Sequence, residues 1–154
     1  MEEIETHMKG IIMPDFHLLE GTIPVAPLNL IVMESALELG NSVDSYISQF
    51  RHDLYSMPGN DPAFHGYVKD SYLISTSTPR FGSGEAKGKL NASIRGNDLY
   101  IMTDVTNWSL TYSISGNINH MSPDDHYQDI KRIIAATGGK AKRIRVIIPF
   151  LYES

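Results

Sequence analysis

The spacing of apolar positions changes along the first third of the chain. Residues 29–33 (NLIVM) form a short continuous apolar run, which is typical of a buried strand. Over residues 34–55 apolar side chains recur every three or four positions, which predicts an amphipathic helix. The face of this helix that we expect to be buried consists of Leu39, Val43, Tyr46, Ile47, Phe50 and Leu54. The sequence PGNDP at 58–62 then predicts a loop.

The middle of the chain predicts further extended segments separated by turns. Residues 71–76 (SYLIST) and 99–102 (LYIM) are rich in β-branched, aromatic and other apolar residues, which favours strands. Between them, PRFGSGE at 79–85 contains two glycines and a proline and therefore predicts a loop, and RGND at 95–98 predicts a turn. Residues 103–121 contain an alternating run, TYSI, ahead of Ser-Gly-Asn, which indicates a hairpin-like excursion.

The last third of the chain predicts a second helix and a final strand. Ser122 and Pro123, followed by two acidic residues, form a typical helix start, and Gly138–Gly139 ends the helix. Residues 143–149 (RIRVIIP) form the last strand. This order of elements predicts an α/β domain with an open, mostly parallel sheet flanked by helices. In such sheets ligands bind outside the carboxyl ends of the strands.

The composition is that of a single globular domain. The 154 residues are 42% hydrophobic and 20% charged, which excludes collagen-like, coiled-coil and wholly disordered chains. The absence of cysteine excludes disulfides, thiolate zinc sites and a cysteine nucleophile. The polar, acidic start of the chain does not resemble a secretory signal, and no apolar run approaches the roughly 18 residues of a spanning helix. We therefore expect a cytoplasmic protein without a membrane partner.

The charge is unevenly distributed along the chain. The net charge of −5 argues against a general nucleic-acid binder. Residues 1–130 hold 17 acids and seven bases, whereas residues 131–154 hold one acid and six bases. The basic end predicts either a local site for a phosphorylated partner or cations gathered at a helix C-terminus. The second interpretation is favoured because the helix dipole attracts cations to that end.

Two other candidate sites have simpler structural explanations. The sequence TGGK at 137–140 superficially suggests a phosphate loop, but it follows a helix and precedes a strand, which favours a helix C-cap. His120, Asp124, Asp125 and His126 lack the spacing of zinc ligands, and both acids occupy helix-capping positions. No nucleophile motif such as GxSxG is present. These residues alone predict no complete active site.

Three stretches in the chain resemble motifs of one enzyme family. RFGSGE at 80–85 resembles the RFxxGE loop of ribose-phosphate pyrophosphokinases, also called phosphoribosyl pyrophosphate (PRPP) synthetases. SIRGNDLYI at 93–101 is similar to the SVRGxDVYI turn and strand of that family, and RIRVIIPF at 143–150 is similar to its RITxVIPY strand. The three motifs occur in the family's order and spacing. The resemblance covers residues 28–154.

The resemblance implies a domain organisation. Subunits of the family contain two similar phosphoribosyltransferase-like domains, and this chain resembles the N-terminal one. Residues 1–27 are expected to be an extended lead-in, and residues 28–154 are expected to form the domain. The stretches 57–70 and 106–121 are insertions relative to the shorter members of the family.

The resemblance also implies a reaction and a binding loop. The family transfers pyrophosphate from MgATP to ribose 5-phosphate, which gives PRPP for nucleotide synthesis. The loop that matches Phe81, Ser83 and Glu85 contacts adenine in the ATP site of a neighbouring subunit. Phe81 can stack on a flat base, and Glu85 can accept a hydrogen bond from an exocyclic amine. Ser83 stands where the family usually has Asp or Asn.

Two functional hypotheses remain open from the sequence. In the family, the metal-binding histidine region, the catalytic lysine loop and the ribose-phosphate loop lie in the second half, so we expect this chain to be inactive alone. The first hypothesis is therefore that it supplies part of the ATP site and the oligomer contacts. The alternative is a non-catalytic regulatory or assembly module with the same fold. In either case we expect at least a homodimer with two-fold symmetry.

Overall fold

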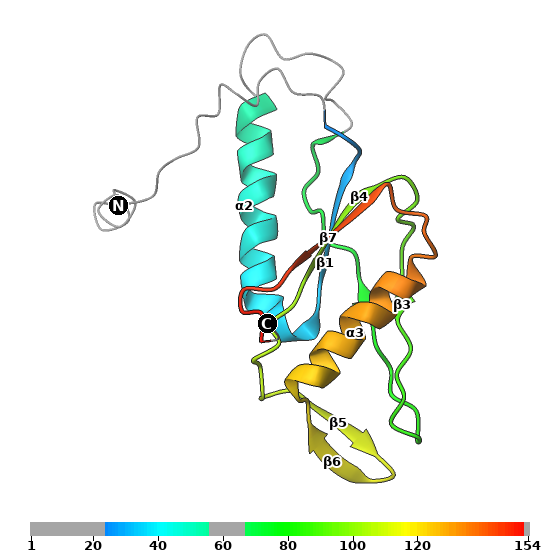
Figure 1. Ribbon diagram of the computed structural model, residues 1–154. Helices are drawn as coiled ribbons and strands as arrows, with labels where there is room; N and C mark the ends of the chain where they lie inside the picture. Colours follow the sequence, from blue (N-terminus) through cyan, green and yellow to red (C-terminus); the bar gives the residue numbers. More distant parts are fainter. Residues whose placement is uncertain (1–23, 56–66, 153–154) are drawn as a thin grey trace, which may run out of the picture.

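The computed structural model describes residues 24–55 and 67–152 (Figure 1). The predicted lead-in at 1–27 lies almost entirely outside these ranges, as does most of the stretch at 57–70. None of the helices in the described ranges is long and apolar enough to cross a lipid bilayer.

A parallel sheet forms the centre of the domain. Its strands are β1 (Leu28–Val32), β4 (Asp98–Met102) and β7 (Arg143–Ile147), which lie in the order β1-β4-β7. Both neighbouring pairs are parallel, with Leu30 opposite Tyr100 and Tyr100 opposite Arg145. The first two strands lie within one residue of the predicted runs at 29–33 and 99–102, whereas β7 begins as predicted at residue 143 and ends two residues earlier than predicted.

A fourth extended segment lies on the other side of β1. The Leu30 amide donates to the Tyr72 carbonyl and the Ile74 amide donates to the Leu30 carbonyl, each over 2.8 Å, which makes a parallel bridge between Leu30 and Leu73. The strand predicted at 71–76 is thus reduced to this bridge and to Thr76, which begins another strand. One reason is that the Tyr72 amide donates to the Asp44 carboxylate at 2.7 Å instead of to a strand.

Two helices cover opposite faces of the sheet. A short 3-10 helix, η2 (Glu34–Ala36), leads into α2 (Leu37–Tyr55), which packs on the face formed by Leu30 and Met102. Helix α3 (Pro123–Ala136) packs on the other face, where Ile133 meets Leu99. After β1 the chain passes through α2 to the bridge at Leu73, on the outer side of β1. After β4 it passes through α3 to β7, on the opposite side of the sheet. The predicted α/β fold with an open parallel sheet is confirmed.

The buried face of α2 differs from the prediction. Leu39 and Tyr46 are 48% and 58% exposed, whereas Gly40 and Asp44 are buried. A Cβ on Gly40 would lie 2.3 Å from the Val32 side chain, so the bare helix backbone touches β1 there. Asp44 is buried because its carboxylate accepts hydrogen bonds from the Tyr72 amide and from Ser71 Oγ. The helix thus rotates toward its small and polar residues.

Two antiparallel hairpins extend from the sheet. Strand β2 (Thr76–Ser77) pairs with β3 (Lys89–Leu90), and the predicted loop at 79–85 lies between them. Strand β5 (Thr111–Ile114) pairs with β6 (Asn117–His120), which confirms the predicted hairpin. Figure 1 shows the loop and the β5–β6 hairpin beyond the end of the sheet.

The ends of α3 agree with the sequence prediction. Ser122 is the N-cap, and a capping box joins it to Asp125: Ser122 Oγ accepts from the Asp125 amide, and the Asp125 carboxylate accepts from the Ser122 amide. Gly138 and Gly139 follow the helix with φ of +56° and +69°. The interpretation of TGGK as a helix end is therefore confirmed, because both residues adopt the left-handed conformation of a C-cap.

The favoured interpretation of the basic residues near the C-terminal end of the chain is that they gather at the end of a helix. Helix α3 does not agree with this interpretation. The last turn of α3 contains no basic residue. Instead Arg143 and Arg145 of β7 both bind the buried carboxylate of Asp98 on β4, with Arg145 Nη1 at 2.8 Å. Cross-strand ion pairing therefore accounts for two of these cations.

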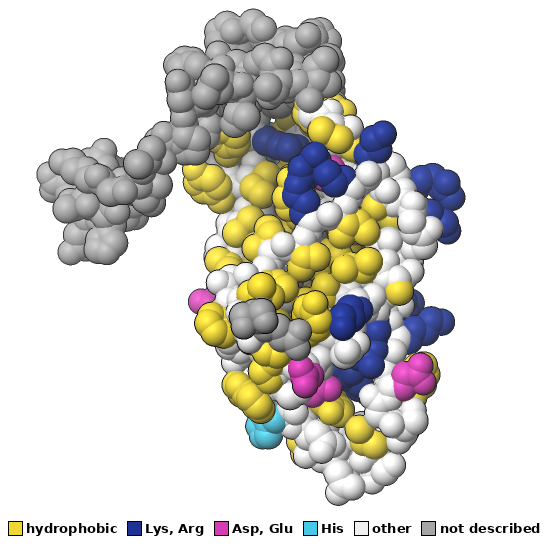
Figure 2. Space-filling model, in the orientation of Figure 1, with side chains coloured by type: hydrophobic (Ala, Val, Ile, Leu, Met, Phe, Trp, Pro, Cys, Tyr) yellow, Lys and Arg dark blue, Asp and Glu magenta, His cyan; other side chains and the backbone are white. Residues whose placement is uncertain are grey.

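Part of the α2 face of the sheet is uncovered in the described part of the chain. A groove of about 460 Å³ lies there, with Val43 and Ile47 on one side and Tyr100 and Ile147 on the other. Figure 2 shows hydrophobic side chains gathered between α2 and β7 on this side of the molecule. A parallel sheet is normally covered on both faces, so this groove is a candidate contact surface.

The Asp98 cluster predicts a pH dependence of stability. The hydrogen bond from Arg143 is the largest influence on the pKa of Asp98, which lies below its usual value of 3.8 although burial opposes the shift. A carboxyl with a lowered folded-state pKa contributes stability above its unfolded pKa, and this contribution is lost as the pH falls through the folded pKa. We expect the difference in urea midpoint between the wild type and Asp98→Asn to be constant above about pH 5 and to shrink as the pH falls through the lowered pKa of Asp98. A difference that grows as the pH falls would contradict this assignment.

Candidate functional site

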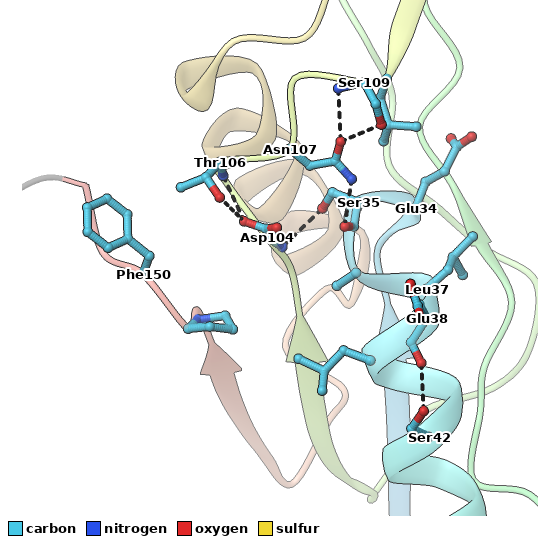
Figure 3. Close-up of a pocket in the computed structure, with 14 residues that line it drawn as sticks. Glu34, Ser35, Leu37, Glu38, Ser42, Asp104, Thr106, Asn107, Ser109 and Phe150 are labelled. Carbon is cyan, nitrogen blue, oxygen red and sulfur yellow. Dashed lines mark hydrogen bonds between the residues drawn. The ribbon is translucent and has the colours of Figure 1, made fainter.

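A pocket of about 780 Å³ lies at the carboxyl ends of the parallel strands (Figure 3). It is lined by the segments that follow β1, β4 and β7, here represented by Ser35, Asp104 and Phe150. The chain winds in opposite directions from β1 and β4, so this is the switch point of the sheet. Ligands of open α/β sheets bind at such points.

Hydrogen bonds join the segments after β1 and β4 into one polar surface. Ser35 Oγ lies 3.0 Å from Thr103 Oγ1 and accepts from the Asp104 amide at 3.1 Å. Asn107 Nδ2 donates to the Ser35 carbonyl at 3.0 Å. The Asp104 carboxylate is turned back onto its own loop, where it accepts from the amide and hydroxyl of Thr106. The rim of the pocket is therefore held in place before any ligand enters.

The charge of this pocket is acidic. Its charged lining residues are Glu34, Glu38 and Asp104, and neither lysine nor arginine lines it in the described part of the chain. The exposed ring of Phe150 supplies an apolar wall on the side of β7. Such a pocket offers hydrogen-bond acceptors and an aromatic face, but it lacks a cation to neutralise a phosphate group.

The three residues predicted to contact a base lie together in one closed loop. The Phe81 amide donates to the Glu85 carbonyl at 2.7 Å, and the Gly84 amide donates to the Phe81 carbonyl at 2.9 Å. Gly84 has φ of +87°, which favours glycine at this turn. The Phe81 side chain is half exposed, and Ser83 and Glu85 are also exposed. The loop therefore presents an aromatic ring, a hydroxyl and a carboxylate to solvent.

A buried ion pair that the sequence does not predict anchors this loop. Arg80 directly precedes Phe81, and its Nη2 lies 2.9 Å from Asp129 Oδ2 on α3. Both side chains are buried, at 8% and 3% exposed. Arg80 belongs to the RFGSGE motif and Asp129 stands beside the apolar Ile130, but neither signal identifies the other residue as its partner.

The histidines and acids near residue 120 do not form a metal site. His126 Nε2 lies 2.8 Å from the Asn107 carbonyl oxygen, and Asp125 belongs to the capping box. Across residues 24–55 and 67–152, no group of three or more His, Asp or Glu side chains is arranged to hold a metal ion. The residues that the structure describes therefore do not fit the magnesium ion that the resemblance implies, and no chemical step is assigned to it.

Comparison with known proteins agrees with the resemblance drawn from the motifs. A crystal structure of phosphoribosylpyrophosphate synthetase from Mycobacterium smegmatis is similar at 18% identity and a TM-score of 0.45. The match covers 80% of this chain and 30% of that chain. A search of curated proteins found no match. The family model of the N-terminal domain of ribose phosphate pyrophosphokinase matches residues 28–154, and the chain belongs to this family.

Proposed function

We propose that this chain is the N-terminal half of a ribose-phosphate diphosphokinase, a transferase that moves pyrophosphate from MgATP to ribose 5-phosphate and so makes PRPP for nucleotide synthesis. Its part is to supply adenine contacts and oligomer contacts. The observation that carries the proposal is the half-exposed ring of Phe81, held in a closed loop with Glu85. An exposed aromatic ring in a fixed loop is suited to stacking on a flat partner.

Each of the three loop residues makes a different contact with adenine in this proposal. Phe81 stacks on the face of the base, and the Glu85 carboxylate accepts from its exocyclic amine. Ser83 contributes a hydroxyl, which can donate or accept but carries no charge. This combination favours adenine over guanine, because the guanine ring has a carbonyl oxygen where adenine has its amine, and that oxygen would face a carboxylate.

The remaining parts of the reaction are assigned to the rest of the enzyme. Pyrophosphoryl transfer depends on positioning and on neutralisation of phosphate charge. The pocket at the carboxyl ends of the strands is lined by acidic residues and, among the described residues, by neither lysine nor arginine. We therefore expect that it does not hold a triphosphate by itself. We therefore expect no PRPP when this chain is incubated with ATP, magnesium and ribose 5-phosphate.

The proposal includes self-association. In the family this loop contacts the ATP site of a neighbouring subunit, and its exposed position here is compatible with that role. The apolar groove between α2 and β7 offers a second surface for contact. We propose at least a homodimer, which sedimentation equilibrium at micromolar concentration tests. A 17.2 kDa monomer throughout would contradict it.

Saturation-transfer NMR tests the adenine contact, since it detects weak binding. With the wild-type chain and millimolar ATP, we expect magnetisation transfer to the adenine protons. Phe81→Ala should reduce this transfer about tenfold, because stacking on an aromatic side chain contributes roughly 1–3 kcal/mol per base. Tyr46→Ala is the matched control, since Tyr46 is similarly exposed at 58% but lies on α2, outside both the loop and the pocket. No transfer in the wild type would contradict the proposal and favour the assembly module.

A further inference from the structure

The anchor of the candidate adenine loop involves three elements of the fold. The Arg80 guanidinium is bound on one side by Asp129 of α3, which also accepts from Arg132 at 2.7 Å. The central carbon of the Arg80 guanidinium also lies 4.7 Å from the centroid of the Tyr112 ring on β5. A guanidinium at this distance from an aromatic ring makes a cation–π contact. Because Arg80 directly precedes Phe81, these contacts fix the start of the loop.

The same hairpin approaches the loop at a second point. A Cβ on Gly84 would lie 3.1 Å from Ile114 Cδ1, so the Ile114 side chain closely approaches the turn of the loop. Tyr112 and Ile114 are two residues apart on β5, and side chains at this spacing lie on the same face of a strand. Both are half-buried, whereas Thr111 and Ser113 on the opposite face are exposed. The buried face of β5 is therefore the face that contacts the loop.

We propose that the β5–β6 hairpin positions the 80–85 loop, with Arg80 and Tyr112 as positioning residues. The hairpin consists of β5 and β6, residues 111–120. Its role is to fix the direction of the Phe81 ring before adenine is bound, which lowers the entropic cost of binding. This inference rests on the proposed function of the loop for its biological purpose, but the contact itself is testable without a nucleotide.

Tyr112→Leu and Tyr112→Phe separate the ring from the hydroxyl. Leucine removes the π face over Arg80 and keeps an apolar side chain, whereas phenylalanine keeps the face. The readout is hydrogen exchange at the amides of Phe81 and Gly84, whose hydrogen bonds close the loop. We expect exchange at these two amides to become about fivefold faster in Tyr112→Leu and to be unchanged in Tyr112→Phe. The Ile101 amide in the buried strand β4 serves as the control and should exchange as in the wild type in both variants.

Three results would overturn the inference. These are unchanged exchange at Phe81 and Gly84 in Tyr112→Leu, equally faster exchange in Tyr112→Phe, or faster exchange that extends to Ile101. Saturation transfer to ATP, measured on the same samples, distinguishes this inference from the proposed function. A loosened loop in Tyr112→Leu, together with no adenine contact in the wild type, supports the positioning role and contradicts the nucleotide role. A loosened loop with about fivefold weaker adenine transfer supports both.

Discussion

Replacing Gly88 with alanine is expected to lower the free energy of unfolding by about 2–3 kcal/mol, at the upper end of the usual cost of overpacking. A Cβ at this position would lie 2.3 Å from the Arg132 carbonyl oxygen and 2.5 Å from its carbonyl carbon. These are backbone atoms of α3, so no side-chain rotation can relieve the clash. The segment before β3 must move away from α3, which also disturbs the neighbouring packing of Leu90 against the core.

The matched control for Gly88→Ala is Gly82→Ala. Gly82 lies in the same region between β2 and β3, and a Cβ added there would meet no other atom within 4 Å. Its φ also lies outside the left-handed region that favours glycine, so we expect stability within about 0.5 kcal/mol of the wild type. Urea unfolding measures both variants. If Gly88→Ala unfolds at the same urea concentration as Gly82→Ala, the close packing of this segment on α3 is wrong.

The elements whose signals are local could be predicted from the sequence. The capping box at Ser122 and Asp125 needs only residues three apart, and it marks the start of α3 to the residue. The strand at 143–147 lies in an apolar run next to that helix in the sequence, and parallel pairing follows from the helical crossover. The loop residues Phe81, Ser83 and Glu85 were identified by a motif, and the structure brings them together in one turn. Their role in binding stays a prediction.

The features that depend on distant partners could not be predicted. Asp44 is buried on α2 because its carboxylate oxygens accept hydrogen bonds from the Tyr72 amide and from Ser71 Oγ. Neither partner can be recognised from helical periodicity. Gly40 lacks a side chain and therefore scores as neutral in an apolar pattern, yet it allows a close approach of α2 to β1. Arg80 likewise has its partner on α3, 49 residues along the chain. In each case a tertiary contact determines which residues are buried.

Replacing Asp129 with alanine is expected to destabilise the domain by about 3 kcal/mol, because removal of one member of a buried ion pair leaves the other charge uncompensated. Asp129 is 2% exposed and binds Arg80 at 2.9 Å and Arg132 at 2.7 Å. The uncompensated charge is that of Arg80, because its side chain is only 8% exposed and is therefore poorly solvated. The loss should therefore also loosen the start of the 80–85 loop.

Arg132→Ala and Asp129→Asn test this explanation of the Asp129→Ala effect. Arg132 is 26% exposed, and its removal leaves the Arg80–Asp129 pair in place, so we expect a loss of at most about 1 kcal/mol. Asparagine keeps the shape and one acceptor oxygen but removes the negative charge, so Asp129→Asn should fall between Arg132→Ala and Asp129→Ala. Urea unfolding at pH 7 gives this order directly. Equal destabilisation in Arg132→Ala and Asp129→Ala would mean that the partly exposed Arg132, rather than the buried Arg80, determines the energy of the cluster.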